Sequence, residues 1–105
     1  MERIKRIKDG KIYDTYSALE VARFWNGLSP NDFRYVREML YKTKKGAWFL
    51  HGCGGAMTQW SESCGNSIIG GGNITPMTAD EALKWCEESS IDVDIIAANF
   101  EITEA

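Results

Sequence analysis

Polar and apolar residues alternate along the start of the chain, in the segment RIKRIKDGKIYD at 3–14. Alternation with a period of two is typical of a strand that buries one face. The alternation is interrupted by Asp9-Gly10, a dipeptide that readily adopts the positive φ angles of a tight hairpin turn. The pattern therefore predicts a β-hairpin that turns at these two residues.

The next segment, DTYSALEVARFWNG at 14–27, has apolar residues at a helical spacing. Asp14 or Thr15 would serve as the N-cap, and Asn26-Gly27 would end the helix. We therefore expect a helix of about three turns, followed by a loop at 28–33. The apolar stripe of this helix would comprise Leu19, Ala22 and Trp25, flanked by Val21 and Phe24.

A second hairpin is predicted in the middle of the chain. Residues 33–43 alternate again and are rich in aromatic side chains, which favours a strand, with a short helical turn at 32–37 as the alternative. Lys44-Lys45-Gly46 would then turn the chain into a partner strand, AWFLHG at 47–52. On that strand, successive side chains would point in opposite directions: Trp48 and Leu50 to one face, Phe49 and His51 to the other.

The last third of the chain begins with glycines and ends with helical patterns. Residues 52–73 contain seven of the ten glycines and predict loops around a short strand at 67–69, before an extended segment at 74–77. Thr78 and Glu81 have the spacing of a capping box, which predicts a helix with an apolar side made of Ala82, Leu83, Trp85 and Cys86. Asp92 would cap a short final helix whose residues Ile95, Ile96 and Phe100 point inward.

These elements predict one α+β domain that spans 1–105, with an antiparallel sheet of about four or five strands packed with two or three helices. A composition of 44% hydrophobic and 26% charged residues is sufficient for a packed core. No apolar run reaches the roughly 18 to 20 residues of a membrane span, and the N-terminal residues lack the apolar region of a signal peptide. The three cysteines are an odd number without tight spacing. We therefore expect free thiols, a cytoplasmic location and no membrane partner.

Charge is divided unevenly along the chain. Residues 1–50 carry 11 basic and 6 acidic residues, a net charge of +5, whereas 51–105 carry 1 and 9, a net charge of −8. This division predicts two faces of opposite sign. The acidic face would comprise Asp80, Glu81, Glu87, Glu88, Asp92 and Asp94. The alternative, basic face would comprise Arg34, Arg37, Lys42, Lys44 and Lys45, joined by Arg3, Lys5, Arg6, Lys8 and Lys11 and by the aromatic residues Tyr35, Tyr41 and Trp48.

Three kinds of chemistry have partial signatures in this sequence. His51 could serve as the base for a Cys53 nucleophile, because strand alternation places both on one face, but no third member of a triad is evident. A zinc site would need His51, Cys53, Cys64 and Cys86, whose spacings fit no common ligand pattern. The glycine runs match neither the dinucleotide fingerprint nor the P-loop. Packing and turn roles account better for these residues, so we expect no catalytic residue, no metal and no cofactor.

Several segments together resemble a family of small proteins, mostly uncharacterised, from bacterial phages, plasmids and conjugative elements. These segments are KIYDT at 11–15, DFRY at 32–35, LYKTKKGAWFLHG at 40–52, GGAM at 54–57 and the later EALKWCEES at 81–89. The family is similar to some small anti-CRISPR proteins. Where its usual form reads GEGGPMS after the hairpin, this chain has GCGGAMT at 52–58 and lacks that acid and that proline.

The resemblance implies a stoichiometric inhibitor or adaptor rather than an enzyme. Its expected partner is a host protein or ribonucleoprotein complex such as a CRISPR effector, and the acidic face would bind a basic groove on that partner. The alternative is a small nucleic-acid-binding or regulatory protein that uses its basic hairpins.

Overall fold

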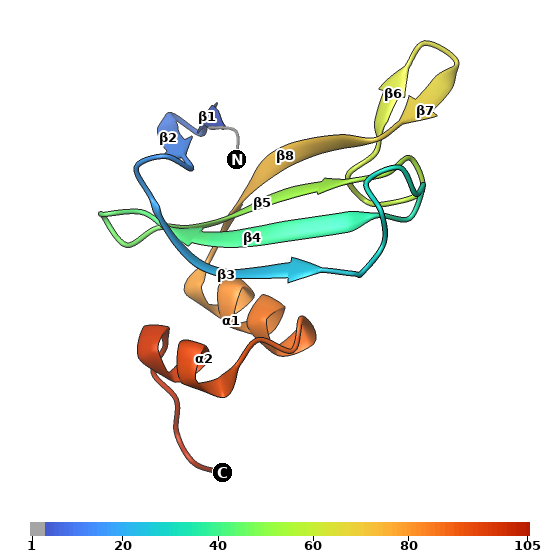
Figure 1. The fold of residues 1–105 in the computed structure, drawn as a ribbon. Coiled ribbons are helices and arrows are strands. Elements are labelled where there is room, and N and C mark those ends of the chain that lie inside the picture. The colour runs from blue at the N-terminus through green and yellow to red at the C-terminus, as the bar shows by residue number, and fades with distance from the viewer. Residues whose placement is uncertain (1–3) are drawn as a thin grey trace.

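A computed structural model describes residues 4–105 of this chain. The structure is α+β and contains a four-stranded antiparallel sheet with strand order β3-β4-β5-β8, two separate two-stranded hairpins, β1-β2 and β6-β7, and two helices (Figure 1). The strands are β1 (Lys5–Lys8), β2 (Lys11–Asp14), β3 (Leu19–Trp25), β4 (Val36–Lys42), β5 (Trp48–Gly54), β6 (Glu62–Cys64), β7 (Ser67–Ile69) and β8 (Gly71–Met77). The helices are α1 (Ala79–Glu88) and α2 (Val93–Asn99).

The first hairpin forms as the alternation predicts. Strands β1 and β2 pair from Lys5 opposite Asp14 to Lys8 opposite Lys11. The two turn residues, Asp9 and Gly10, have φ angles of 51° and 74°. Two successive positive φ angles give the turn the right-handed twist that suits an antiparallel pair, so the turn residues determine where the chain reverses.

The predicted helix at 14–27 is wrong, because this segment forms strand β3 at the edge of the sheet. Its pairing with β4 is interrupted by a bulge between Glu20 and Ala22. A bulge inserts one extra residue, so Leu19 and Ala22 lie on the same face of the strand although they are three positions apart. That spacing is also the spacing of a helix, which explains why the apolar pattern resembled one.

The second hairpin is confirmed, with a shorter first strand. Strand β4 begins at Val36, and residues 30–34 form turns. The β4-β5 turn closes through a hydrogen bond from the Thr43 amide to the Ala47 carbonyl, and Gly46 has a φ angle of 89°. Trp48 and Leu50 belong to one buried cluster while Phe49 belongs to another, as the alternation predicts.

The glycine-rich stretch is more regular than the sequence suggests. The short strand at 67–69 is confirmed as β7, but β5 extends to Gly54, β6 precedes the hairpin turn, and β8 begins at Gly71. Gly52 has a packing role, because a Cβ atom there would overlap the Trp60 ring. The missing side chain allows this indole to lie directly against the sheet.

Both predicted C-terminal helices are present. The capping box of α1 is complete, since the Thr78 side chain accepts from the Glu81 amide and the Glu81 side chain accepts from the Thr78 amide. Asp92 caps α2, as expected. Ile96 and Phe100 pack against the core, whereas Ile95 is exposed, so its predicted inward position is wrong.

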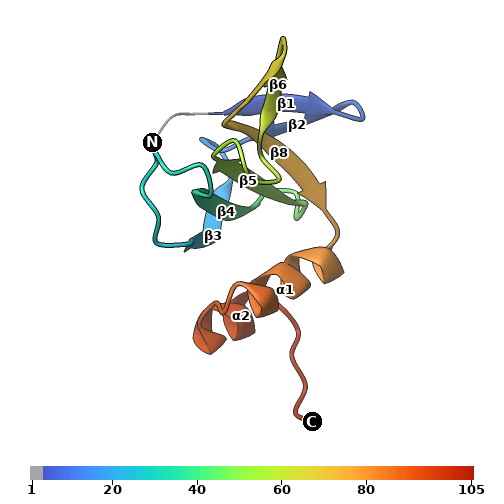
Figure 2. The same ribbon diagram turned by 90° about the vertical axis from the view of Figure 1, so that its right-hand side faces the viewer.

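The sheet has a different cover on each side (Figure 2). The two helices lie against one face, where they pack on apolar side chains that include Leu40, Trp48 and Leu50. The β1-β2 hairpin lies over part of the other face, and its Tyr13 ring packs edge-on against Phe49 at 5.5 Å between centroids. The sheet is therefore the middle layer of a small two-sided core.

One acidic side chain is buried in the helix-side core. Glu38 on β4 is 6% exposed, and its carboxylate accepts three hydrogen bonds. Trp60 Nε1 and Gln59 Nε2 donate to Oε2 at 2.8 and 2.7 Å, and Trp85 Nε1 donates to Oε1 at 2.9 Å. Within the part of the chain described, no lysine or arginine forms an ion pair with this carboxylate. The three donors therefore replace its hydration.

Replacing either buried indole is expected to destabilise the fold. Trp48→Ala removes a ring that stacks on Phe100 at 4.7 Å, and Trp85→Ala removes both a buried ring and a donor to Glu38. Each change should lower the free energy of unfolding by about 3 to 5 kcal/mol, measured by chemical denaturation. Trp25→Ala is the matched control, because Trp25 is 59% exposed and should lose only about 1 kcal/mol. A loss of less than about 0.5 kcal/mol at Trp48 or Trp85 would contradict the packing described.

The acceptor role of Glu38 predicts a specific sensitivity to its amide analogue. Glu38→Gln keeps the side-chain shape but places an NH₂ group against an N–H donor in either amide orientation. The free energy of unfolding should fall by about 1 to 3 kcal/mol, because a buried donor loses its acceptor. The control is Glu101→Gln in the exposed C-terminal segment, which should change stability by less than about 0.5 kcal/mol. Equal stability of the two variants would rule out this role.

Candidate functional site

The six acidic residues predicted as a partner-binding face all belong to the helical layer and are all exposed. Two of them also have local roles: Glu81 completes the capping box of α1, and Asp92 accepts from the Asp94 amide at 2.8 Å. Glu87 and Glu88 occupy the last turn of α1, which contains no basic residue. The structure therefore gathers the predicted acidic residues on one layer of the molecule.

The predicted basic face is divided between different parts of the structure. Lys42 lies on the helix side, with its Nζ atom 5.1 Å from the centre of the Trp48 ring. Arg34 lies in the β3-β4 connection and pairs with Asp32 at 3.5 Å. Arg37 lines a cavity on the face opposite the helices. The five residues Arg34, Arg37, Lys42, Lys44 and Lys45 thus do not form one continuous face.

A smaller group of basic residues does come together. A groove of about 650 Å³ lies between the first hairpin and the β4-β5 turn, and its lining includes Lys11, Lys44 and Lys45. Lys11 comes from β2 and the other two from the turn, so the groove is a product of tertiary structure. Arg3, which was also predicted as part of a basic surface, lies outside the described residues.

The four residues considered for zinc do not meet. His51 and Cys53 share one face of β5, but Cys86 is buried on α1 across the sheet, and Cys64 is exposed on the β6-β7 hairpin. All three cysteines are free thiols. Among residues 4–105, no group of three or more His, Cys, Asp or Glu side chains is arranged to hold a metal ion.

His51 and Cys53 instead line a cavity of about 400 Å³ with two arginines. Arg37 on β4 is directly opposite Cys53 in the strand register, and Arg6 comes from the β1-β2 hairpin. The full lining is Ile4, Arg6, Arg37, Met39, His51, Cys53, Gly72 and Asn73. Among residues 4–105 the lining contains no carboxylate that could orient the imidazole, so none of these residues supplies the third member of a catalytic triad in this cavity.

The imidazole of His51 lies in an unusual environment. Its side chain is 9% exposed, and Nδ1 is the one buried side-chain nitrogen or oxygen atom of the described residues without a hydrogen-bond partner. Burial lowers the pKa of His51 below its ordinary value of 6.5, and the positive charges of Arg37 and Arg6 lower it further. The histidine is therefore neutral near pH 7.

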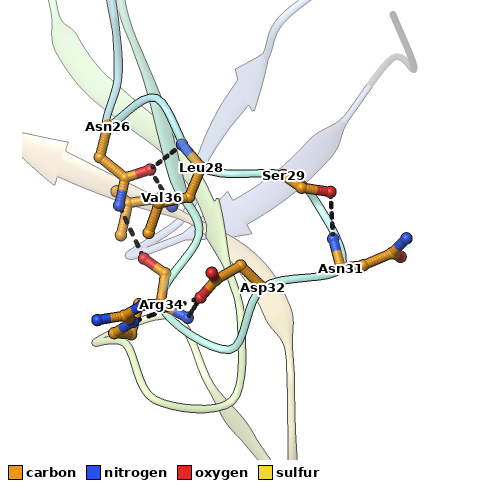
Figure 3. A network of polar contacts seen from close by, with 7 residues as sticks. All are labelled: Asn26, Leu28, Ser29, Asn31, Asp32, Arg34 and Val36. Carbon is orange, nitrogen blue, oxygen red and sulfur yellow. Dashed lines mark hydrogen bonds and ion pairs between the residues drawn. The ribbon is translucent and has the colours of Figure 1, made fainter.

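The β3-β4 connection is ordered by one asparagine (Figure 3). Asn26 donates from Nδ2 to the Arg34 carbonyl at 2.7 Å, and its Oδ1 accepts from the amides of Leu28 and Val36 at 3.3 and 3.1 Å. This loop also contacts the segment after β5, through a bond from the Met57 amide to the Phe33 carbonyl. Phe33 and Met57 are 66% and 70% exposed, so the two loops together present apolar side chains to solvent.

Sequence reasoning placed Arg6 and Arg37 on a general basic surface and missed their common cavity. The pairing of Arg37 with Cys53 depends on the strand register, and the approach of Arg6 depends on where the first hairpin lies over the sheet. Only the shared face of His51 and Cys53 was readable from alternation.

Comparisons of this chain with known protein families, with curated proteins and with solved structures find no match. In the part of the chain that is described, neither helix has the length and apolar character needed to cross a membrane.

The lowered pKa of His51 predicts a pH dependence of stability. Below pH 6.5 the unfolded chain binds a proton at this histidine while the folded chain does not, so folding should become less stable as the pH falls from 6.5 toward the folded pKa. Denaturation curves between pH 8 and pH 5 measure this loss. His51→Gln removes the titrating group and should show a smaller loss over the same range. The same pH dependence in both proteins would exclude His51 as the source.

Proposed function

We propose that this chain is a stoichiometric protein-binding inhibitor from a mobile genetic element, active in the bacterial cytoplasm. Its target would be a host complex with a basic surface for nucleic acid, and a CRISPR effector fits that description. The resemblance to small proteins of phages, plasmids and conjugative elements gives the class of target, and the charge of the helical layer gives the surface that would bind it.

The placement of Glu87 and Glu88 is the observation that carries this proposal. Both lie in the last turn of α1, where the helix dipole favours basic residues and disfavours acids by about 0.3 to 1 kcal/mol each. The two ion pairs within residues 4–105 join Arg23 to Glu20 and Arg34 to Asp32, so neither glutamate is compensated by a salt bridge. Acids in this position do not stabilise the helix, which favours a role in binding.

The rest of the helical layer has the same sign. Residues 78–105 contain eight acidic residues and one basic residue, Lys84. A surface of this kind increases the encounter rate with a basic partner and competes electrostatically with nucleic acid for a basic groove.

The groove that includes Lys11, Lys44 and Lys45 favours a second function, direct binding of nucleic acid. Lysines that neutralise phosphates release counterions, so this binding would weaken steeply as the salt concentration rises. Retention on DNA or heparin at low salt, lost in Lys44→Glu/Lys45→Glu, would support this second function over the first.

The inhibitor function predicts which charges control association. In target-cleavage assays with a panel of CRISPR effectors, the chain should inhibit one of them fully at about one molecule per complex. Glu87→Lys/Glu88→Lys should then slow association with that effector about tenfold at low salt, because attraction becomes repulsion. Association rates measured at two salt concentrations test this, and the difference should shrink at the higher one.

Lys44→Glu/Lys45→Glu is the matched control, since it reverses two charges on a different part of the molecule. It should leave association with the effector nearly unchanged. The opposite ranking of the two variants would favour the lysine groove as the binding surface, and equal rates for both would mean that neither charged surface contacts the target.

A further inference from the structure

The cavity between the first hairpin and the open face of the sheet combines two arginines and a buried histidine, and no acid from residues 4–105 lines it. Within the described residues, no hydrogen bond or ion pair engages the Arg37 side chain, and Arg6 donates only to the carbonyl of the adjacent Lys5, at 3.1 Å. Two guanidinium groups that face the same space without a counter-charge repel each other. The positive charge that they bring to the cavity favours an anionic ligand.

The buried imidazole is an independent observation at the same place. His51 is more than nine-tenths buried and lines the cavity, and its Nδ1 atom has no partner among the described residues. A buried polar atom without a partner destabilises the folded state, and native proteins retain few of them. The Nδ1 atom itself has almost no accessible surface, so a group bound in the cavity contacts the imidazole through the part of the ring that lines the wall.

We propose that this cavity binds the phosphate group of a small phosphorylated molecule, with Arg6 and Arg37 on the phosphate oxygens and His51 as a further hydrogen-bond partner. A phosphate monoester carries close to two negative charges at neutral pH, which matches two guanidinium groups. Arginine presents a planar set of donors that suits phosphate oxygens. This site is separate from the acidic helical layer, which lies across the sheet.

The size of the cavity indicates more than a bare ion. A volume of about 400 Å³ falls within the range of small-molecule sites, roughly 300 to 1,000 Å³. Met39 and Ile4 supply apolar walls for the part of the ligand that bears the phosphate. The terminal phosphate of a short oligonucleotide has the same chemistry and would also fit. The experiment below distinguishes a free phosphorylated molecule from an oligonucleotide end.

Within residues 4–105, three charged or titratable residues line the cavity beside His51. Arg6 comes from β1, Arg37 from β4 and Cys53 from β5, while β8 contributes Gly72 and Asn73 to the lining. A bound phosphate would offset the two positive charges and so raise the pKa of His51 toward its ordinary value. Because His51 is the chain's only histidine, its ring signals in a nuclear magnetic resonance spectrum are unambiguous.

The test is a titration of the full chain with inorganic phosphate, followed by the His51 ring signals. Phosphate should shift these signals saturably and raise the pKa of His51, whereas chloride at the same ionic strength should not. Arg37→Gln and Arg6→Gln should each weaken phosphate binding about tenfold or more, as expected for the loss of a charge-assisted hydrogen bond. Lys84→Gln removes one positive charge from the exposed side of α1, across the sheet from the cavity, and should leave the affinity within about twofold.

Four further titrations identify the source of the phosphate. The ligands are adenosine 5′-monophosphate, adenosine, and a short DNA strand with and without a 5′-phosphate. Tighter binding of the mononucleotide than of the phosphorylated strand would assign a free small molecule, and the reverse would assign a nucleic-acid end. Adenosine and the unphosphorylated strand should not shift the His51 signals.

The absence of a saturable shift with inorganic phosphate would overturn the proposal. So would an equal effect of chloride, or an equal loss of affinity in Lys84→Gln and Arg37→Gln. If Arg37→Gln does not fold, the wild-type titration and Arg6→Gln decide the matter, because Arg6 is exposed on the hairpin and is not part of the core.

Discussion

The carboxylate of Glu38 joins three parts of the chain that are far apart in sequence. It receives its hydrogen bonds from Gln59 and Trp60, after β5, and from Trp85 on α1. Because Glu38 is buried without an ion-pair partner in the described chain, it depends on all three donors to replace water. This requirement fixes the segment after β5 and the helical layer relative to the sheet, and it explains why Gly52 leaves space for the Trp60 ring.

The helices attached in this way separate the charged groups onto two sides of the sheet. The acidic side chains are exposed on the helical layer. The cavity lined by Arg6 and Arg37 lies on the opposite face of the sheet, next to the first hairpin. The two sets of charges are therefore held apart by the sheet and its core, and salt in the solvent screens exposed charges at such separations. Such an arrangement gives one small domain two surfaces of opposite electrostatic preference.

Local signals predicted the elements that are determined locally. Asp9-Gly10 reverses the chain through its positive φ angles, and the capping box of Thr78 and Glu81 starts α1. Both effects act within a few residues. The segment at 14–27 was misread because a bulge in β3 gives two residues on one strand face a helical spacing. Whether that segment is helix or strand depends on its pairing with β4, and no local sequence pattern indicates that pairing.

The sequence by itself determined the β1-β2 and β4-β5 hairpins, the two C-terminal helices, the α+β class and the uneven division of charge along the chain. These features follow from turn residues, caps, periodicity and composition, which are properties of short segments. Only the tertiary structure decided that Glu38 is an acceptor for two indoles, and that Arg6 and Arg37 share a cavity with His51. Such contacts depend on strand register and on how the layers pack. Both are determined by interactions between groups that are far apart in the sequence.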